Sequence, residues 1–393
     1  MAIEASAAPT AGGRIRLGMV GGGVGAFIGA VHRIAARIDD RFDLVAGALS
    51  STPEKSRESG AALGLAPDRI YDSFATMAKA EAARPDGIQA VAIVTPNHMH
   101  YPAAKAFLDA GIHVICDKPL TATTDDARAL ARAVKSSGKL FILTHNYTGY
   151  PLIRQARAMI AAGELGSLRY VQAEYAQDWL TNAAETSGSK QAEWRTDPER
   201  SGAGGAIGDI GTHAYNLLSF VTGLTLDRVL ADLTSFVPGR RLDDNVEVLL
   251  RFADGAKGML WASQIAVGQE NSLSLRVYGD KAGLEWHQEN PNQLWFTRFG
   301  EPKQLLTRNG AGTGEAGRRV SRLPPGHPEG YLEGFATIYS EAAEAIGAAE
   351  AGTTPNAAVT YPTIEDGLKG MAFIAACVRS STAGGIWTEV EAP

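Results

Sequence analysis

Three ionisable residues stand in two short motifs that could handle a proton. Lys118 lies between Asp117 and Pro119, and about ninety residues later Asp209 and His213 stand four positions apart. An imidazole has an ordinary pKa near 6.5, which suits it to take a hydroxyl proton near neutral pH. A lysine ammonium can stabilise the negative charge that then develops on the oxygen. Each residue alone also fits an ordinary role, as a surface lysine, a helix-capping aspartate and a packed helix histidine.

A glycine-rich loop near the N-terminus indicates that this proton accompanies a hydride. The loop follows an apolar segment at 15–20 that is typical of a buried strand, and it precedes helical spacing at 27–38. In such a strand, turn and helix, Gly21 permits the tight turn, Gly23 lets backbone amides approach a pyrophosphate, and Ala26 allows close helix packing. The pyrophosphate would lie at the positive N-terminus of the helix.

Composition limits the class of protein. The chain has 393 residues, 45% of them hydrophobic and 20% charged, which is typical of a soluble globular protein with two domains. No apolar run reaches the length of a membrane span, and 1–13 reads as a disordered tail without the features of a signal peptide. Two cysteines indicate a reducing cytoplasm, with Cys116 an inert strand residue, and a net charge of -6 gives no basic surface for nucleic acid.

The first part of the chain, 14–145, alternates strand and helix patterns. After the glycine loop, strands are expected at 42–49, 88–94, 112–116 and 140–144, with helices at 53–63, 101–110 and 124–137. This alternation predicts a doubly wound parallel sheet that binds its ligand at the carboxyl ends of the strands. Thr95, Asn97, His98 and Lys118 all fall at those ends.

The remainder, 146–393, has a different rhythm and is expected to form a second domain. Extended segments are expected at 168–177, 227–237, 246–252, 256–266, 272–278, 283–287 and 293–299, with hairpin turns between several of them. They predict a largely antiparallel sheet, and helices are expected at 213–222, 331–349 and 364–379. A long loop beside the site is expected at 301–328.

Taken together, these motifs resemble those of the glucose-fructose oxidoreductase / inositol dehydrogenase / MocA family over nearly the whole chain. The resemblance rests on the glycine loop, Thr95-Pro96-Asn97 with His100, Asp117-Lys118-Pro119, and Gly204-Gly205 leading to Asp209 and His213. The family more often has glutamate where Asp117 stands. The resemblance implies a C-terminal α+β domain with a large open sheet that pairs subunits into a homodimer or homotetramer, and a substrate site in the cleft between domains.

The resemblance and the motifs together assign site residues. The catalytic residues are Lys118, Asp209 and His213. The cofactor-binding residues are Gly21, Gly23, Val24, Gly25, Ala26, Phe27, Ser50, Ser51, Thr95, Asn97, His98, His100, Asp117 and Lys118. The substrate-binding residues are Lys118, Tyr147, Trp179, Arg195, Asp209, His213 and His327, with Asp178 as a further candidate.

Several of these assignments have an ordinary alternative. Tyr147 and Trp179 are equally explicable as core aromatics, and Arg195 as a surface ion pair with Asp197 or Glu199. Asn97 also fits a turn or a helix cap. No third ligand accompanies Asp209 and His213, so no metal site is expected.

The choice of cofactor depends on the end of the second strand, where an acid would bind the adenosine ribose. The segment there carries Ser50 and Ser51 and no acid, and Lys55 and Arg57 follow. Serines can bind a ribose or a 2′-phosphate, so the sequence leaves NAD and NADP open.

Three classes of function fit the sequence. The favoured class is an NAD(P)-dependent dehydrogenase that oxidises a secondary hydroxyl of a sugar, anhydrosugar or inositol. A glycoside hydrolase that oxidises and re-reduces its substrate with bound NAD is an alternative, and so is a non-catalytic regulator that senses the nucleotide. The substrate, the carbon oxidised and the physiological direction stay open.

Overall fold

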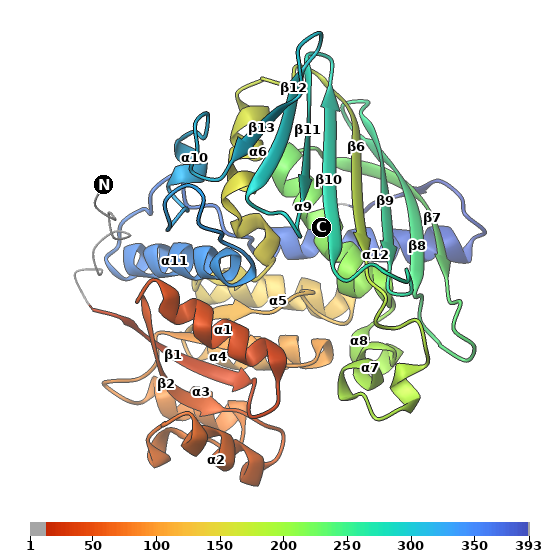
Figure 1. Ribbon diagram of the computed structural model, residues 1–393. Coiled ribbons are helices and arrows are strands. Elements are labelled where there is room, and N and C mark those ends of the chain that lie inside the picture. Colours follow the sequence, from red (N-terminus) through yellow and green to blue (C-terminus); the bar gives the residue numbers. More distant parts are fainter. Residues whose placement is uncertain (1–12, 392–393) are drawn as a thin grey trace. The chain divides into compact units, whose positions relative to one another are not determined.

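The computed structural model describes residues 13–391, so most of the tail expected at 1–13 lies outside the described residues (Figure 1). The chain forms two compact units. The first contains the residues up to Thr121, Asp125–Gly149 and Tyr331–Leu368. The second contains Ala122–Thr124, Tyr150–Gly330 and the chain from Lys369 onward.

The first unit is built on a five-stranded parallel sheet. Its strands are β1 (Ile15–Gly21), β2 (Phe42–Ala48), β3 (Ala90–Val94), β4 (His113–Cys116) and β5 (Phe141–Leu143), in the order β2-β1-β3-β4-β5. The strands are almost wholly apolar because both faces of the sheet are covered, as in other parallel sheets. This sheet confirms the doubly wound fold expected from the sequence.

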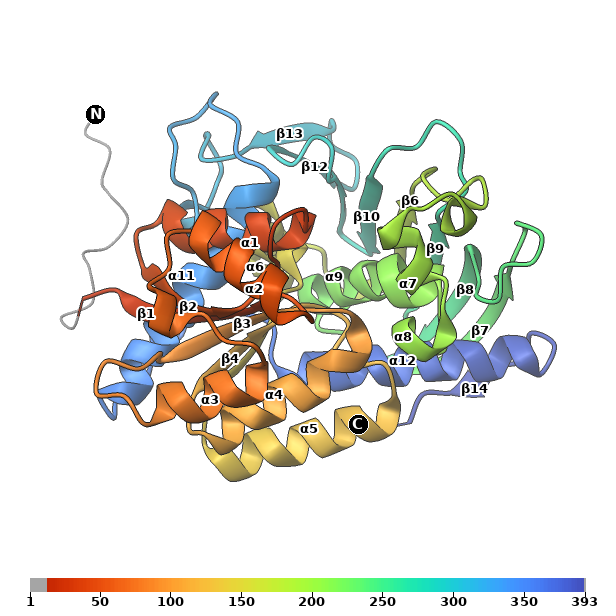
Figure 2. The ribbon, with the colours of Figure 1, turned by 90° about the horizontal axis from the view of Figure 1, so that it is seen from below.

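Helices cover both faces of this sheet (Figure 2). On one face lie α1 (Phe27–Ile38) and α11 (Tyr331–Glu350), and on the other lie α3 (Phe74–Ala82), α4 (His100–Asp109) and α5 (Thr124–Ser137). A further helix, α2 (Pro53–Ala62), follows β2. The helix α3 was not predicted from the sequence, and it begins where the side chain of Ser73 accepts a hydrogen bond from the amide of Thr76 at 3.1 Å.

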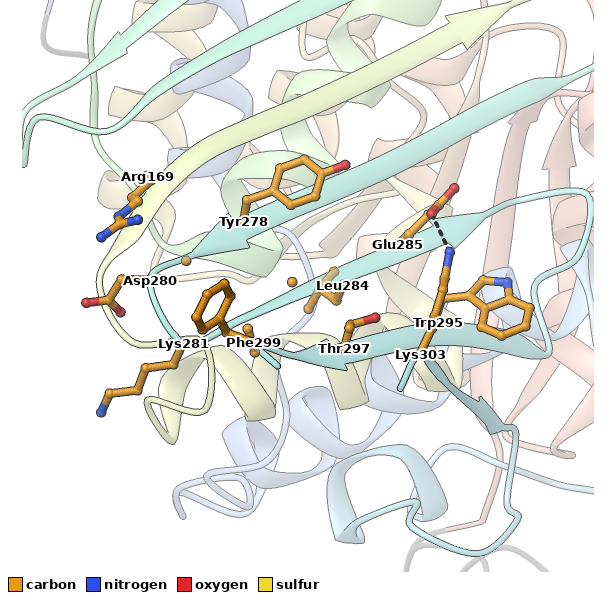
Figure 3. Close-up of a pocket in the computed structure, with 13 residues that line it drawn as sticks. Arg169, Tyr278, Asp280, Lys281, Leu284, Glu285, Trp295, Thr297, Phe299 and Lys303 are labelled. Atoms are coloured by element: carbon orange, nitrogen blue, oxygen red, sulfur yellow. Dashed lines mark hydrogen bonds and ion pairs between the residues drawn. The ribbon is translucent and has the colours of Figure 1, made fainter. Parts of the chain in front are cut away.

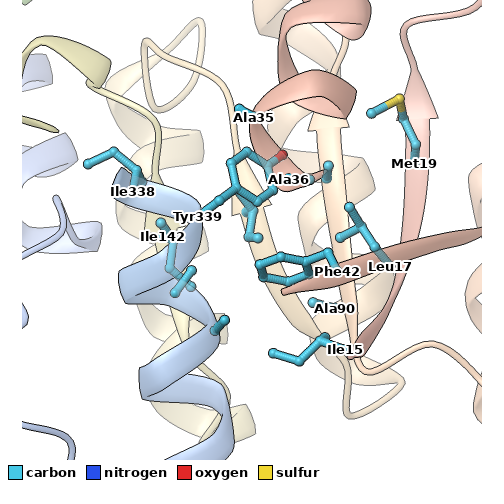
Figure 4. Packing of buried hydrophobic residues seen from close by; sticks show 14 of the residues in the cluster. Ile15, Leu17, Met19, Ala35, Ala36, Phe42, Ala90, Ile142, Ile338 and Tyr339 are labelled. Atoms are coloured by element: carbon cyan, nitrogen blue, oxygen red, sulfur yellow. The ribbon is translucent and has the colours of Figure 1, made fainter. Parts of the chain in front are cut away.

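The buried core of the first unit includes a helix from late in the chain. Ile338 and Tyr339 of α11 lie among residues of β1, β2 and α1 (Figure 4). The ring of Tyr339 meets that of Phe42 edge-on, with centroids 5.3 Å apart. The chain therefore returns to the first unit at Tyr331–Leu368, a return that the expected division at 145/146 does not include.

The second unit is built on a nine-stranded sheet with the order β13-β12-β11-β10-β6-β9-β8-β7-β14. β6 and β9 pair in parallel, and the other neighbouring pairs are antiparallel. This confirms the mainly antiparallel sheet, with β6 near its middle. The strands are β6 (Leu168–Ala176), β7 (Leu226–Thr234), β8 (Asn245–Phe252), β9 (Lys257–Ser263), β10 (Ser272–Gly279), β11 (Ala282–His287), β12 (Gln293–Arg298), β13 (Gln304–Thr307) and β14 (Thr388–Glu389).

One face of the nine-stranded sheet is covered by α6 (Pro151–Ala161) and α9 (Thr212–Thr222) (Figure 1). Phe373 of α12 (Ile364–Thr382) stacks on Tyr215 of α9, with ring centroids 4.4 Å apart. Three short helices lie in connecting segments: α7 (Lys190–Arg195), α8 (Pro198–Ser201) and α10 (Glu315–Arg318). The loop expected at 301–328 thus contains β13 and α10. Within residues 13–391, no helix is both long and apolar enough to cross a membrane.

Candidate active site

The glycine-rich loop between β1 and α1 is shaped for close approach by a ligand. Gly25 has a φ of +83°, and a side chain there would meet no other atom within 4 Å, so the loop is open at this point. Gly23 is enclosed instead, since a Cβ would lie 2.5 Å from Ser59 Oγ. Ala26, the residue before α1, provides no side-chain cap. The backbone amides at the N-terminus of the helix can therefore face an anion, as anion sites at helix ends require.

Close packing of α1 against the loop occurs at Gly29, three residues beyond the position, Ala26, for which the sequence predicted it. A Cβ on Gly29 would lie 2.4 Å from the Cα of Gly22. The exposed Val24 and Phe27 flank the turn, with 70% and 67% of their surface accessible.

The end of β2 carries two serines and is followed by Lys55, which is exposed, and by Arg57. Ser50 is half-buried, and its Oγ lies 3.4 Å from the amide of Thr52, whereas Ser51 is exposed. Arg57 is engaged by two acids, Asp72 at 2.8 Å and Glu54 at 3.5 Å. This arrangement favours a ribose with free hydroxyls over a 2′-phosphate.

Lys118 lies just beyond β4, in a loop held by its neighbour Asp117. Oδ1 of Asp117 accepts hydrogen bonds from the amide of Lys118 at 2.8 Å and from the hydroxyl of Thr144 at 3.2 Å. The Asp117 carboxylate therefore ties the ends of β4 and β5 together. Its contacts support the position of the lysine backbone.

His100 is a second support for the same loop. It is 1% exposed, and its ring nitrogens lie 2.8 Å from the carbonyl oxygen of Pro119 and 3.0 Å from that of Thr95. Burial lowers the pKa of His100. The side chain links the loops after β3 and β4, which favours a supporting role over the direct cofactor contact expected from the sequence.

Several buried polar atoms near the carboxyl edge of this sheet have no hydrogen-bond partner within residues 13–391. Among the residues that the structure describes, Thr95 Oγ1, His98 Nδ1 and Asn146 Nδ2 are buried and form no hydrogen bond. Such groups ordinarily have partners, and their clustering at the ends of β3 and β5 is what a polar ligand would satisfy. Asn146 was not predicted, and its signal was its position shortly after a buried strand, β5.

His145, also missed, lies next to Asn146. It is 2% exposed. Burial, with a smaller contribution from the charge of Lys118, lowers the pKa of His145 to about 3. Its imidazole is therefore neutral near pH 7.

In the second unit, Asp209 and His213 lie on one continuous helix, 206–222, which begins with a π-helical turn at Ile207–Gly211. Residues four apart on a helix share a face. Asp209 Oδ2 lies 3.2 Å from Nε of Arg195 and accepts a hydrogen bond from Nε2 of Gln264 at 2.9 Å. The partner of Arg195 is thus Asp209, not the neighbours Asp197 or Glu199 that its sequence position suggested.

His213 is nearly buried, with 8% of its surface exposed. Its ring lies edge-on to that of Tyr175, with centroids 6.2 Å apart. The hydroxyl of Tyr175 donates to Oδ1 of Asn271 at 2.7 Å, and the amide of Gln177 donates to the same oxygen at 2.7 Å. Trp179 Nε1 donates in turn to Oε1 of Gln177 at 3.0 Å.

This chain of hydrogen bonds joins the expected residue Trp179 to the surroundings of His213. It combines hydroxyl, amide and indole groups, which suit a ligand with many hydroxyls. Gln177, Gln264 and Asn271 carried no motif and were not predicted.

Three other residues expected to bind substrate, Asp178, Tyr147 and His327, make different contacts. Oδ2 of Asp178 accepts from the amide of Gly268 at 3.1 Å, so it stabilises a turn. Tyr147 belongs to the first unit, is 4% exposed and packs against Tyr331 with centroids 6.4 Å apart. His327 is exposed in the loop after α10, where its carbonyl oxygen accepts from Arg308.

An open groove of about 650 Å³ lies over β10, β11 and β12 of the second unit (Figure 3). Its lining includes Tyr278, Trp295 and Phe299, and an ion pair of Lys303 with Glu285 at 3.1 Å. None of the expected catalytic or substrate residues lines it. The groove therefore belongs to the surface of the sheet and not to the candidate active site.

Comparisons with known proteins decide the family. The model of the "Oxidoreductase family, NAD-binding Rossmann fold" matches residues 15–145, and that of the "GFO/IDH/MocA C-terminal domain" matches residues 153–285. This chain belongs to the Gfo/Idh/MocA family of oxidoreductases. The first unit therefore contains a NAD-binding Rossmann domain, which fits its open glycine loop and uncapped α1.

Three similar proteins illustrate the family. An oxidoreductase from Sinorhizobium meliloti is 60% identical, with a TM-score of 0.87, over 95% of this chain and 99% of its own. An inositol dehydrogenase homolog from Azotobacter vinelandii, solved with NADH and myo-inositol, is 37% identical, with a TM-score of 0.91, over 97% of this chain and 99% of its own. A levoglucosan dehydrogenase from Pseudarthrobacter phenanthrenivorans is 27% identical over 71% of this chain and 75% of its own.

The end of β2 leads to a prediction about the nucleotide. Ser50→Asp should raise the preference for NAD over NADP by about tenfold or more, because a carboxylate accepts hydrogen bonds from ribose hydroxyls and repels a 2′-phosphate. Dissociation constants for both nucleotides, measured by quenching of intrinsic fluorescence, check this. Ser136→Asp adds the same charge on the exposed surface of α5 and should leave the ratio unchanged. An unchanged ratio in Ser50→Asp would show that Ser50 is not at the ribose.

Proposed function

We propose that this oxidoreductase is an NAD-dependent dehydrogenase that oxidises a secondary hydroxyl of a sugar, anhydrosugar or inositol. The observation that carries the proposal is the single helix that bears Asp209 and His213, with Asp209 held by Arg195 and Gln264. A helix with a nearly buried imidazole and a fixed carboxylate is suited to proton transfer and has no evident use in a protein that only senses a nucleotide.

His213 acts as the base in this proposal. Removing a hydride from a carbinol carbon leaves a carbonyl only when the hydroxyl proton also departs, and His213 accepts that proton. Bound NAD⁺ supplies the acceptor for the hydride. Asp209 orients the imidazole and stabilises its protonated form through its negative charge.

Lys118 acts on the same hydroxyl as a fixed cation. Its ammonium group stabilises the negative charge that builds on the oxygen as the proton leaves, and its hydrogen bonds help to orient the substrate. Support comes from the loop itself, in which Asp117 and His100 restrain the backbone on both sides of the lysine. This restraint suits a group that must be placed before the reaction begins.

The substrate class is supported by the polar residues around His213 and by the relatives. Gln177, Asn271 and Tyr175 offer amide and hydroxyl groups, and Trp179 offers an aromatic surface, 37% exposed. Such a mixture suits a ring with several hydroxyls. One relative is a levoglucosan dehydrogenase, and another is an inositol dehydrogenase homolog that was solved with myo-inositol.

The partner that best fits the sheet of the second unit is another copy of this chain, in a homodimer or homotetramer. One face of the sheet carries α6 and α9, while the other exposes Leu249 and Tyr278, 48% and 43% accessible. An exposed, partly apolar sheet face is typical of a protein interface. The groove over β10–β12 belongs to this face (Figure 3).

The cation leads to the first test of this mechanism. Lys118→Ala should lower kcat by a factor of about 10² to 10³ because the developing alkoxide loses its stabilising charge, while the Kd of NAD⁺ changes little. Steady-state formation of NADH from a panel of inositols, aldoses and anhydrosugars measures the rate. Lys105→Ala is the matched control, since Lys105 is an exposed lysine of α4 paired with Asp109. A rate close to that of the wild type in Lys118→Ala would reject the catalytic role.

The base leads to a test by pH. The oxidative kcat/KM should fall as the pH drops through the pKa of His213, because the protonated imidazole cannot accept another proton. His213→Asn should lose most of the rate, and Asp209→Asn should keep part of it with a shifted acid limb. The pH profiles of all three proteins, at saturating NAD⁺, check this. If His213→Asn kept both the rate and the acid limb, another group would be the base.

A further inference from the structure

The start of the helix that carries Asp209 and His213 is held by one buried aspartate from the loop between β7 and β8. Asp243 Oδ1 accepts from the amide of Gly205 at 2.6 Å, and its Oδ2 accepts from the amide of Ile207 at 2.8 Å. Its main-chain oxygen accepts from the amide of Ala206 at 2.8 Å. One residue therefore satisfies three consecutive backbone N–H groups.

These three amides are groups that a helix cannot satisfy internally. The first N–H groups of a helix have no carbonyl partner within it, and a cap usually comes from a side chain just before the helix. Ala206, at the start of the π-helical turn, provides no side-chain cap. Asp243 supplies the cap from a distant part of the chain, and its negative charge faces the positive end of the helix.

The glycine pair before the helix permits this contact. A Cβ on Gly205 would lie 2.1 Å from the main-chain oxygen of Asp243, so a larger residue there would push the two segments apart. The carbonyl oxygen of Gly205 also accepts from the amide of Asp209 at 2.9 Å. The same peptide segment is thus bonded to Asp243 on one side and to Asp209 on the other.

Asp244, the residue after Asp243, supports the side chain of Asp209. The carbonyl oxygen of Asp244 accepts from the amide of Gln264 at 2.8 Å, and Gln264 donates to the carboxylate of Asp209. Asp244 is itself fully buried and accepts from Arg240 at 3.0 Å. The segment Asp243-Asp244 therefore fixes both the backbone and the side chain of Asp209.

We propose that Asp243 is a positioning residue for the oxidation: through the amides of 205–207 it sets the orientation of the helical turn that presents Asp209 and His213. The proposal rests on the catalytic roles assigned above to those two residues. Asp243 does not touch the reacting atoms. It acts through the helix.

The ionised form of Asp243 makes the stronger contact. A carboxylate accepts charge-assisted hydrogen bonds with both oxygens, whereas in a carboxylic acid the protonated oxygen is a weaker acceptor and the bonds lose their charge assistance. Burial raises the pKa of Asp243 to about 6, the charge of Asp244 also acts to raise it, and the charge of Asp243 in turn raises the pKa of Cys377 of α12. Below about pH 6, a growing fraction of molecules should therefore have a loosened helix start.

The variant Asp243→Asn tests the proposal with two measurements. It should lower the oxidative kcat/KM by about 10- to 100-fold, with the Kd of NAD⁺ unchanged within about twofold. At low pH, log kcat/KM should fall more steeply in the wild type than in Asp243→Asn, because the wild type must have one more group, Asp243, deprotonated in addition to His213. A purely structural role would not change the number of ionisations. A wild-type slope of one would overturn the proposal even if the variant did not fold.

Hydrogen exchange of the amides at 205–213 tests the anchoring itself. Exchange should be faster in Asp243→Asn and unchanged in Asp280→Asn, a control in which a distant carboxylate of the same unit, bonded to the amide of Ser167 at 2.8 Å, is removed. Faster exchange with the wild-type rate and acid limb would overturn the positioning role. If Asp243→Asn has the wild-type kcat/KM and His213→Asn is inactive, this inference alone is overturned. If His213→Asn has the wild-type kcat/KM, the proposed function and this inference are both overturned.

Discussion

Backbone N–H groups at the ends of buried strands and helices have no partner within their own element, and the rest of the chain must satisfy them. In the first unit the start of α1 is left open, as an anion site requires, while the amide of Lys118 is bonded to Asp117. In the second unit the amides of 205–207 converge on Asp243. The groups expected to bind nucleotide, stabilise charge and take a proton are therefore all placed by the way these element ends are satisfied.

The fold could be predicted largely from hydrophobic patterning, because a parallel sheet buried on both faces requires apolar strands separated by helices. The neighbours of each element could not. The pattern predicted the helix now seen as α11, but nothing local indicates that Tyr339 packs against Phe42, some three hundred residues earlier. Similarly, β6 to β12 were expected as strands, whereas the edge strands β13 and β14 were not, and the parallel pairing of β6 with β9 depends on contacts between distant segments.

In the candidate site, too, some features could be predicted from the sequence and others depend on contacts between distant segments. Lys118, Asp209 and His213 stand in compact motifs, so the sequence alone could propose them as catalytic residues. Arg195 was predicted as a substrate-binding residue, with an ion pair to an acid close in sequence as the alternative, and the fold pairs it with Asp209. Supporting residues such as Gln264 contact the site from far along the chain and belong to no motif. A residue that reacts can be recognised by its type and spacing, whereas one that only orients another is recognised from the folded contacts.

The measurement that tests the central claim most directly is the fate of the carbon-bound hydrogen of the substrate. A polyol that supports NADH formation would be prepared with deuterium at its carbinol carbons and incubated with the enzyme and NAD⁺, and the reduced nucleotide analysed by mass spectrometry. Direct hydride transfer predicts one deuterium in each NADH formed and a ketone product in equal amount. Cleavage of a glycoside without net formation of NADH, or NADH that contains no deuterium, would contradict the account.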